Sequence, residues 1–254
     1  MPDPTPYPGI NALLHLLLAG VQAVLGDRFA GLYLYGSLAA GEFDPARSDI
    51  DFLVATTAEL PAGLVPTLAA MHERIAAASP RWAATLEGSY IPLDALRRYD
   101  PAHAVHPHLT MGDGLHVEHH GADGVILRHV LREWGIVLAG PPPHTLIDPV
   151  TPADLRRAVV DLFHSWWAPV LEDSTRIHLP AYQAYAALTM CRILYTLHHG
   201  AVVPKPLAAR WAQTALGDPW APLIDDALLW HPGRPFDHLP QTLDLIRHTR
   251  DRIQ

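Results

Sequence analysis

Apolar residues follow a helical period near the start of the chain and shorter runs after it. Between residues 10 and 25 they recur three or four positions apart, which predicts a helix with one buried face. Two short apolar runs, 32–35 and 50–54, predict buried strands. Residues 64–78 predict a second helix, and the period-two pattern of 82–92 predicts a third strand beside the second.

The pattern changes along the second half of the chain. Residues 93–124 are rich in Gly, Pro and His and are expected to be irregular, followed by a helix over 125–134 and a short strand after Gly135. Beyond Pro149 the strand signal vanishes. Helices are predicted there over 152–168, 182–199, 204–216, 222–230 and 240–253. We therefore expect an α/β domain over 1–149, a mixed sheet with flanking helices, and an all-α helical bundle over 150–254.

The stretch from Leu32 to Val54 carries the candidate chemistry. Gly36 and Ser37 end the first strand, and the free N–H groups of such a turn before a helix can bind phosphate. Asp49 and Asp51 are two residues apart at the head of the second strand, so they project together. Paired carboxylates are best held by a divalent cation such as Mg²⁺. The combination indicates nucleotidyl or phosphoryl transfer; the alternative is a hairpin with solvated acids.

Composition narrows the possible classes. The 254 residues, 49% of them hydrophobic, suffice for one large or two small domains. A net charge of -8 argues against a nucleic-acid partner and suits a small cationic substrate. Because Cys191 is the single cysteine, no internal disulfide can form. The apolar runs are too short to span a membrane and the N-terminus is unlike a signal peptide, so we expect a cytoplasmic monomer without a membrane partner.

The motif resembles a known signature. Gly36-Ser37 followed by Asp49-x-Asp51 inside an apolar strand looks like the nucleotidyltransferases related to DNA polymerase beta. Later stretches, among them 128–143, are similar to the streptomycin/spectinomycin adenylyltransferases, and the likeness runs to about residue 231. The resemblance implies antibiotic resistance through Mg²⁺-dependent transfer of AMP from ATP to a hydroxyl of an aminoglycoside-type small molecule. It also implies two Mg²⁺ ions, and a helical domain that closes over nucleotide and acceptor.

The resemblance implies roles for individual residues. Asp49 and Asp51 would hold the metals, and Glu87 would act beside them as metal neighbour and general base. The spacing of Glu87 alone is equally consistent with an acid on the surface of an edge strand. The implied nucleotide-binding set is Gly36, Ser37, Ser48, Asp123, Arg192 and Lys205. Residue chemistry leaves simpler readings open for three of these: a helix-capping acid at Asp123, a snorkelling Arg192, and a surface lysine at Lys205.

The acceptor site is the least defined part. Aminoglycoside-modifying relatives place carboxylates and a tryptophan ahead of the helix that carries Arg192. The candidates for that position are Trp166, Trp167, Glu172 and Asp173. Streptomycin enzymes have an Asp near the start of that helix, whereas residues 179–185 hold no acid, which argues against streptomycin. Tyr182 and Tyr185, which begin the helix, are expected to be core residues rather than a stacking surface.

Three alternatives stay open. The same chemistry could act on another acceptor, such as a natural product, a sugar or a protein hydroxyl. The chain could be a nucleotide-binding sensor without turnover, although a sensor has no use for Glu87 beside the Asp pair. The His-rich tract 103–120, with His116, His119 and His120 at ligand-like spacing, could bind metal in a non-enzymatic protein. For this tract, lining the active-site cleft is favoured over a dedicated zinc site.

Overall fold

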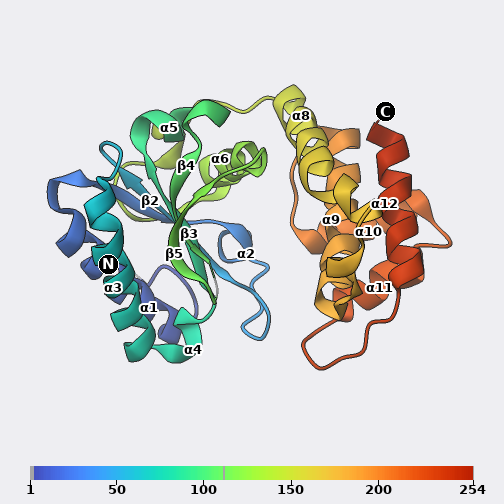
Figure 1. Ribbon diagram of the computed structural model, residues 1–254, viewed down its shortest axis with the longest axis horizontal. Coiled ribbons are helices and arrows are strands. Elements are labelled where there is room, and N and C mark those ends of the chain that lie inside the picture. Colours follow the sequence, from blue (N-terminus) through green and yellow to red (C-terminus); the bar gives the residue numbers. More distant parts are fainter. Residues whose placement is uncertain (1–2, 111, 254) are drawn as a thin grey trace. The chain divides into compact units, whose positions relative to one another are not determined.

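Two units make up the chain, Met1–Pro149 and Val150–Gln254 (Figure 1). The computed structural model describes residues 3–110 and 112–253, so residues 1–2, 111 and 254 lie outside the description. The first unit combines a sheet with helices, and the described part of the second unit consists of helices and their connections. The expected fold class, an α/β domain followed by a helical bundle, is confirmed.

The sheet of the first unit has six strands in the order β5-β4-β3-β2-β1-β6. Their bounds are β1 (Phe29–Leu34), β2 (Ile50–Thr56), β3 (Leu86–Pro92), β4 (Val105–Thr110), β5 (Gly114–His119) and β6 (Ile136–Ala139). The β2–β3 pair is parallel and the other neighbouring pairs are antiparallel, so the sheet is mixed. A parallel pair needs a crossover connection, which here contains the helix α3 (Val65–Ala78).

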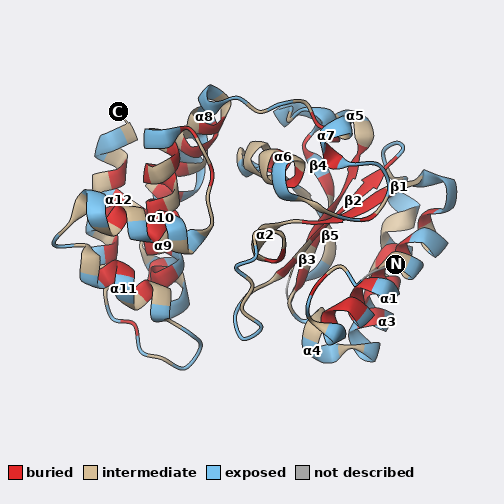
Figure 2. Ribbon diagram, turned by 180° about the vertical axis from the view of Figure 1, so that it is seen from behind, coloured by how far each residue is buried: buried red, intermediate tan, exposed pale blue. Residues whose placement is uncertain are grey.

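Helices cover both faces of this sheet (Figures 1 and 2). On one face, α1 (Pro8–Leu25) and α3 contribute to the core that includes Phe52 and Val54 of β2. On the other face, α5 (Leu93–Arg97) and α6 (Asp123–Trp134) pack with Leu53. Because side chains alternate along a strand, Asp51 projects to the same face as Leu53. The candidate carboxylate therefore lies on the α5–α6 side of the sheet.

The helix α1 has a length and composition that would allow it to cross a membrane. The argument from short apolar runs was therefore wrong for this segment. Its apolar face nevertheless packs inside the first unit. The side chains of this face are fully buried in the core shared with the sheet: Ile10, Leu14, Leu17 and Val21. We interpret α1 as a core helix of the first unit on this ground.

The expectation of an irregular segment over 93–124 was wrong. It contains α5 and the β4–β5 hairpin, which extends the sheet beyond β3. The period-two pattern of β4 was hidden because its inward positions are polar: His106 and His108 are 4% and 9% exposed. A pattern search that treats histidine as polar cannot detect such a strand. The predicted strand over 82–92 begins later, at Leu86, because Trp82 belongs to the short helix α4 (Pro80–Ala83).

The remaining short helices of the first unit are α2 (Gly36–Ala39) and α7 (Pro143–Leu146). The second unit contains the helices α8 (Pro152–Leu162), α9 (Pro180–His199), α10 (Lys205–Leu216), α11 (Ala221–Leu229) and α12 (Leu239–Ile253). Thr151 caps α8 in a reciprocal capping box with Asp154, as expected from Thr151-Pro152. The chain then continues through a π-helical segment, Phe163–Trp167. The long helix α9 contacts α8, α10, α11 and α12 and forms the centre of the bundle.

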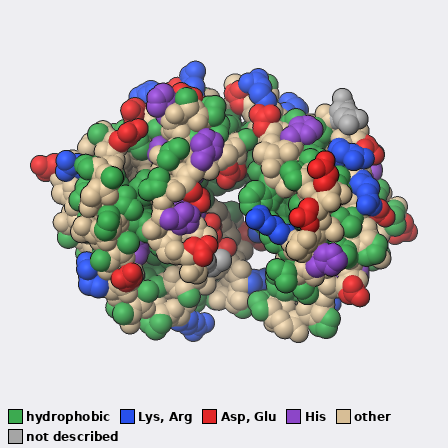
Figure 3. Space-filling model, viewed as in Figure 1, with side chains coloured by type: hydrophobic (Ala, Val, Ile, Leu, Met, Phe, Trp, Pro, Cys, Tyr) green, Lys and Arg blue, Asp and Glu red, His purple; other side chains and the backbone are tan. Residues whose placement is uncertain are grey.

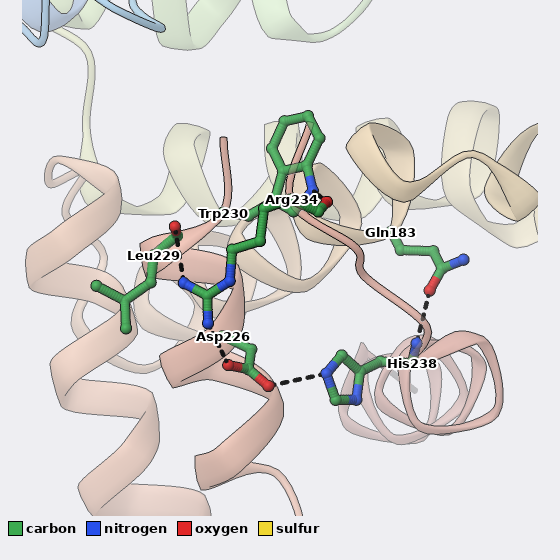
Figure 4. Close-up of polar contacts among 6 residues, drawn as sticks. All are labelled: Gln183, Asp226, Leu229, Trp230, Arg234 and His238. Atoms are coloured by element: carbon green, nitrogen blue, oxygen red, sulfur yellow. Dashed lines mark hydrogen bonds and ion pairs between the residues drawn. The ribbon is translucent and has the colours of Figure 1, made fainter. Parts of the chain in front are cut away.

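A polar network fixes the connection between α11 and α12 (Figure 4). Asp226 accepts from Arg234 at 3.1 Å and lies 2.9 Å from Nε2 of His238 through its other oxygen. Gln183 of α9 accepts the backbone N–H of His238 at 2.9 Å. Arg234 also donates to the carbonyl of Leu229. This irregular segment is thus tied by side chains to two helices of the bundle.

Candidate active site

Asp51 and Glu87 are register partners on the parallel strands β2 and β3. Residues paired in this way lie about 4.8 Å apart along the hydrogen-bonding direction and share one face of the sheet. Each is the half-buried second residue of a strand whose other residues are buried. Asp49 directly precedes β2 and is also half-buried. The predicted adjacency of the two strands is therefore confirmed, and it brings Glu87 beside Asp51.

The turn after β1 lies against the carboxylate of Asp51. Gly36 has φ +65°, and a Cβ at this position would collide with Oδ2 of Asp51. The backbone N–H of Tyr35 donates to the carbonyl of Asp51 at 3.1 Å. The hydroxyl oxygen of Ser37 is buried and has no hydrogen-bond partner among the described residues. Glycine is required here both by backbone conformation and by space, and the Ser37 hydroxyl is available to a polar ligand.

The buried hydroxyl of Tyr35 lies close enough to three carboxylates for their charges to act on it. Burial raises the pKa of its hydroxyl well above the usual value, and the negative charges of Asp51, Glu87 and Asp123 raise it further. Because the charge of Asp123 acts on Tyr35 as those of Asp51 and Glu87 do, Asp123, in the first turn of α6, belongs to the same group of carboxylates. Burial raises the pKa of Asp123, while the backbone N–H groups of Asp123 and Gly124 oppose that shift. Sequence reasoning missed Tyr35; its only signal was its place just before Gly36.

His108 of β4 is a second residue that sequence reasoning did not single out. Its Nε2 lies 3.5 Å from Oε1 of Glu87, and its Nδ1 is 2.8 Å from the hydroxyl of Ser89, two residues further along β3. Ser89 and His108 are register partners, so the strand pairing itself brings them together. The sequence offered only the His-rich composition of the tract, which was expected to line a cleft.

Ser48 shapes the loop that leads into Asp49. Its hydroxyl accepts the backbone N–H of Asp44 at 3.0 Å, and its own N–H donates to the carbonyl of Asp44 at 2.8 Å. Asp44 also pairs with Arg47 at 2.7 Å. These contacts give Ser48 a structural role in presenting Asp49, whatever else its hydroxyl contacts when ligands are bound.

The donor set at this site fits Mg²⁺. Asp49, Asp51 and Glu87 offer only carboxylate oxygens, the hard ligands that Mg²⁺ prefers. The Gly36 turn leaves room for the Asp51 carboxylate and provides the Ser37 hydroxyl, which has no hydrogen-bond partner in the described part of the chain. Both features fit phosphate oxygens next to such an ion.

In the second unit, Tyr185 and Arg192 lie seven residues apart on α9 and so share one helix face. The side chain of Lys205, at the start of α10, reaches over the ring of Tyr185, with Nζ 5.4 Å from the ring centroid. The two basic residues expected to contact the triphosphate are therefore both associated with the Tyr185 face of α9. Tyr185 is 44% exposed, so the expectation that it is a core residue was wrong.

The four residues predicted to bind the acceptor differ in their exposure to solvent. Trp167 is 1% exposed and packs against Tyr182 and Tyr185, which makes it a core residue. Trp166 is 47% exposed and donates from Nε1 to the hydroxyl of Tyr182 at 3.0 Å. Glu172 is exposed, and Asp173 uses its carboxylate to accept from Thr175. Of the two tryptophans, only Trp166 is exposed, and the guanidinium of Arg176 lies over its ring, 5.5 Å from the centroid.

Comparisons with known proteins match this architecture. Residues 23–80 match the family described as "Nucleotidyltransferase domain". Residues 145–254 match the family described as "Aminoglycoside adenylyltransferase, C-terminal domain". Two separate family models thus match the chain, one within the first unit and one spanning the second. Gly36, Asp49 and Asp51 lie within the stretch that matches the first family, and Arg192 and Lys205 lie within the stretch that matches the second.

Individual relatives of these two domains agree with that assignment. The chain is 30% identical over 126 residues to an aminoglycoside (3'') (9) adenylyltransferase of Escherichia coli, covering 49% of this chain and 44% of that protein. It is 32% identical over 107 residues to the enzyme of the same name from Klebsiella pneumoniae, covering 41% and 37%. The matched stretches thus span less than half of these curated relatives.

A solved structure resembles the whole chain in fold. Spectinomycin adenyltransferase AAD(9) from Enterococcus faecialis, determined with ATP and spectinomycin, superimposes with a TM-score of 0.73. The superposition covers 95% of this chain and 98% of that chain at 16% sequence identity. At this identity the match establishes that the two chains share a fold.

Proposed function

We propose that this chain transfers AMP from ATP to a hydroxyl of an aminoglycoside-type antibiotic in a Mg²⁺-dependent reaction and releases pyrophosphate. One observation carries the proposal: the carboxylate of Asp51, the register partner of Glu87, lies against the Gly36 turn within the stretch that matches the nucleotidyltransferase family. The adenylyltransferase C-terminal domain and the curated relatives support an antibiotic as acceptor. We further propose that the protein acts in the cytoplasm as a monomer.

Each candidate residue has a defined part in this proposal. Asp49 and Asp51 would hold Mg²⁺, which when bound supplies Lewis-acid stabilisation of the triphosphate charge. The Gly36 turn and the Ser37 hydroxyl would bind phosphate oxygens. Glu87 would accept the proton of the acceptor hydroxyl, whose oxygen forms a bond to the α-phosphorus as the bond to pyrophosphate breaks. Two Mg²⁺ ions are proposed because the three carboxylates offer enough oxygens for both.

The residues proposed to bind the acceptor lie in the segment before α9. The exposed side chain of Trp166 would pack against a sugar-like ring, and the exposed carboxylate of Glu172, nearby in sequence, suits a cationic molecule. The acid-free start of α9 argues against streptomycin, so spectinomycin is the better first candidate. Other hydroxyl acceptors would use the same chemistry at Glu87. A sensor without turnover is disfavoured by the close placement of Glu87 and Asp51.

The direct test is pyrophosphate release from ATP and Mg²⁺ across a panel of aminoglycosides that includes spectinomycin and streptomycin. We expect release with at least one drug and none with the Asp51→Asn variant. Release with no drug, together with Mg²⁺-dependent ATP binding, would refute the antibiotic acceptor and leave the nucleotide site. Failure to bind ATP at all would refute the proposed function as a whole.

Lys205 offers a test of the nucleotide contacts in the second unit. We expect Lys205→Met to raise the KM for ATP at least about tenfold, because a hydrogen bond to a charged group contributes about 1.5–3 kcal/mol. Steady-state kinetics with ATP varied would measure this change. Lys205→Arg should recover most of the loss, and Arg210→Met, an exposed residue of the same helix, serves as the control. An unchanged KM in Lys205→Met would remove Lys205 from the site.

A further inference from the structure

Three potential metal ligands converge on the outer strands of the sheet. His108 of β4, Glu118 of β5 and His120 just after β5 each offer one ligand atom, and these atoms all lie within 4.8 Å of one another. Figure 3 shows histidine and acidic side chains side by side on the surface of the first unit. Two imidazoles and one carboxylate form a different donor set from the all-carboxylate group at Asp49 and Asp51.

Neighbouring side chains orient two of these ligands. The Nδ1 atom of His108 is 2.8 Å from the Ser89 hydroxyl, so its Nε2 is the nitrogen that faces Oε1 of Glu118 at 3.8 Å. The other oxygen of Glu118, Oε2, is 3.0 Å from Nε2 of His116. Metal-binding sites in proteins show this arrangement, in which a second polar contact fixes the orientation of each ligand.

His120 provides an independent observation. The residue is 8% exposed, and its Nε2 atom is buried without a hydrogen-bond partner among the described residues. Its ring lies beside that of His108, with centroids 5.4 Å apart. A buried polar nitrogen without a partner calls for an explanation, and an ion at the cluster would provide one. Hydrogen bonds to Ser89 and His116 account for Nδ1 of His108 and Oε2 of Glu118, whereas Nε2 of His120 has no such bond among the described residues.

We propose that His108, Glu118 and His120 form a binding site for a divalent transition metal such as Zn²⁺. Imidazole nitrogen and carboxylate oxygen in a three-ligand set are typical of Zn²⁺ sites that keep an open position, whereas Mg²⁺ prefers oxygen ligands alone. The site is distinct from the proposed Mg²⁺ site but adjacent to it, because Oε1 of Glu87 is 3.5 Å from Nε2 of His108. The metal would join β4 to the end of β5 next to the proposed base.

The test is calorimetric titration of the full chain with ZnCl₂ in excess Mg²⁺, which needs no assay of AMP transfer. We expect one Zn²⁺ per chain, bound at least about tenfold more weakly by His120→Asn. Ser89→Ala, which removes the contact that orients His108, should weaken binding by about 10- to 100-fold. His119→Asn replaces an exposed neighbour outside the cluster and should bind as the wild type does.

Two further measurements keep the test decisive. Circular dichroism and thermal melting establish that each variant is folded before its affinity is compared. Asp51→Asn should retain Zn²⁺ binding, because Asp51 is outside the cluster. Equal Zn²⁺ affinity of the wild type and His120→Asn, or a loss caused by Asp51→Asn instead, would overturn the proposal. Either result is independent of whether AMP transfer is found, so failure of this site and failure of the proposed function are distinguishable.

Discussion

Glu87→Gln is expected to lower kcat of AMP transfer by about 10²- to 10⁴-fold, the usual contribution of a positioned general base. Glutamine keeps the size of the side chain beside Asp51 and an amide oxygen that can still contact Mg²⁺, so the β2–β3 register and the nucleotide site should remain intact. The KM for ATP should therefore change little, and the loss should appear in kcat. Steady-state kinetics with both substrates varied would separate the two parameters.

The matched control for this variant is Glu73→Gln on α3, an exposed residue outside the site. It should keep the wild-type rate. Both variants should melt close to the wild-type temperature, because Glu87 is half-buried and its replacement leaves no cavity. A Glu87→Gln protein with kcat within twofold of wild type would show that Glu87 is not the base. His108, 3.5 Å away, would then be the next residue to test.

The central part of the site could be predicted because its signals are local. Gly36-Ser37 and Asp49-x-Asp51 each lie within one turn or one strand, where side-chain direction follows from spacing. The position of Glu87 required one further step, the expectation that the next predicted strand lies beside the Asp pair. The structure confirms that step and adds the residue-level register that spacing alone does not contain.

The histidine cluster could not be predicted because it depends on pairing between strands that the hydrophobic pattern did not reveal. His108 reaches Glu87 and Glu118 only because β4 lies between β3 and β5. The sequence spacing drew attention to His116, His119 and His120, of which only His120 belongs to the cluster. His119 is exposed on β5 and lies outside the cluster, whereas His116 contacts Oε2 of Glu118.

The exposure of the two tryptophans proposed for the acceptor site also could not be predicted from the sequence. Trp166 and Trp167 are neighbours, so about 100° of helical rotation separates their side chains. Which of them faces solvent depends on how the helix is rotated about its axis. Both tryptophans lie in the π-helical segment Phe163–Trp167, which departs from the 3.6-residue period. Sequence periodicity therefore could not show that Trp167 is core and Trp166 exposed.

The free energy of unfolding is expected to fall as the pH is lowered from 7 to 4, in part because of His72. This residue of α3 is buried, with Nε2 2.7 Å from the hydroxyl of Tyr90. Burial lowers its pKa from 6.5 to about 4. Below pH 6.5 the unfolded chain binds a proton that the folded chain does not. Stability is therefore lost between pH 6.5 and 4 and levels off below 4; the His72 contribution is about 3 kcal/mol.

Urea denaturation of the wild type and His72→Gln across this pH range would isolate that contribution. Glutamine can still bond to Tyr90 but does not titrate, so the variant should show a flatter pH dependence by about 3 kcal/mol. Other histidines titrate in both proteins and cancel in the difference. His15→Gln, at an exposed position of α1, should give a curve parallel to the wild type. If the His72→Gln and wild-type curves are parallel from pH 6.5 to 4, then His72 is not held neutral in the fold, and the acid sensitivity must come from other groups.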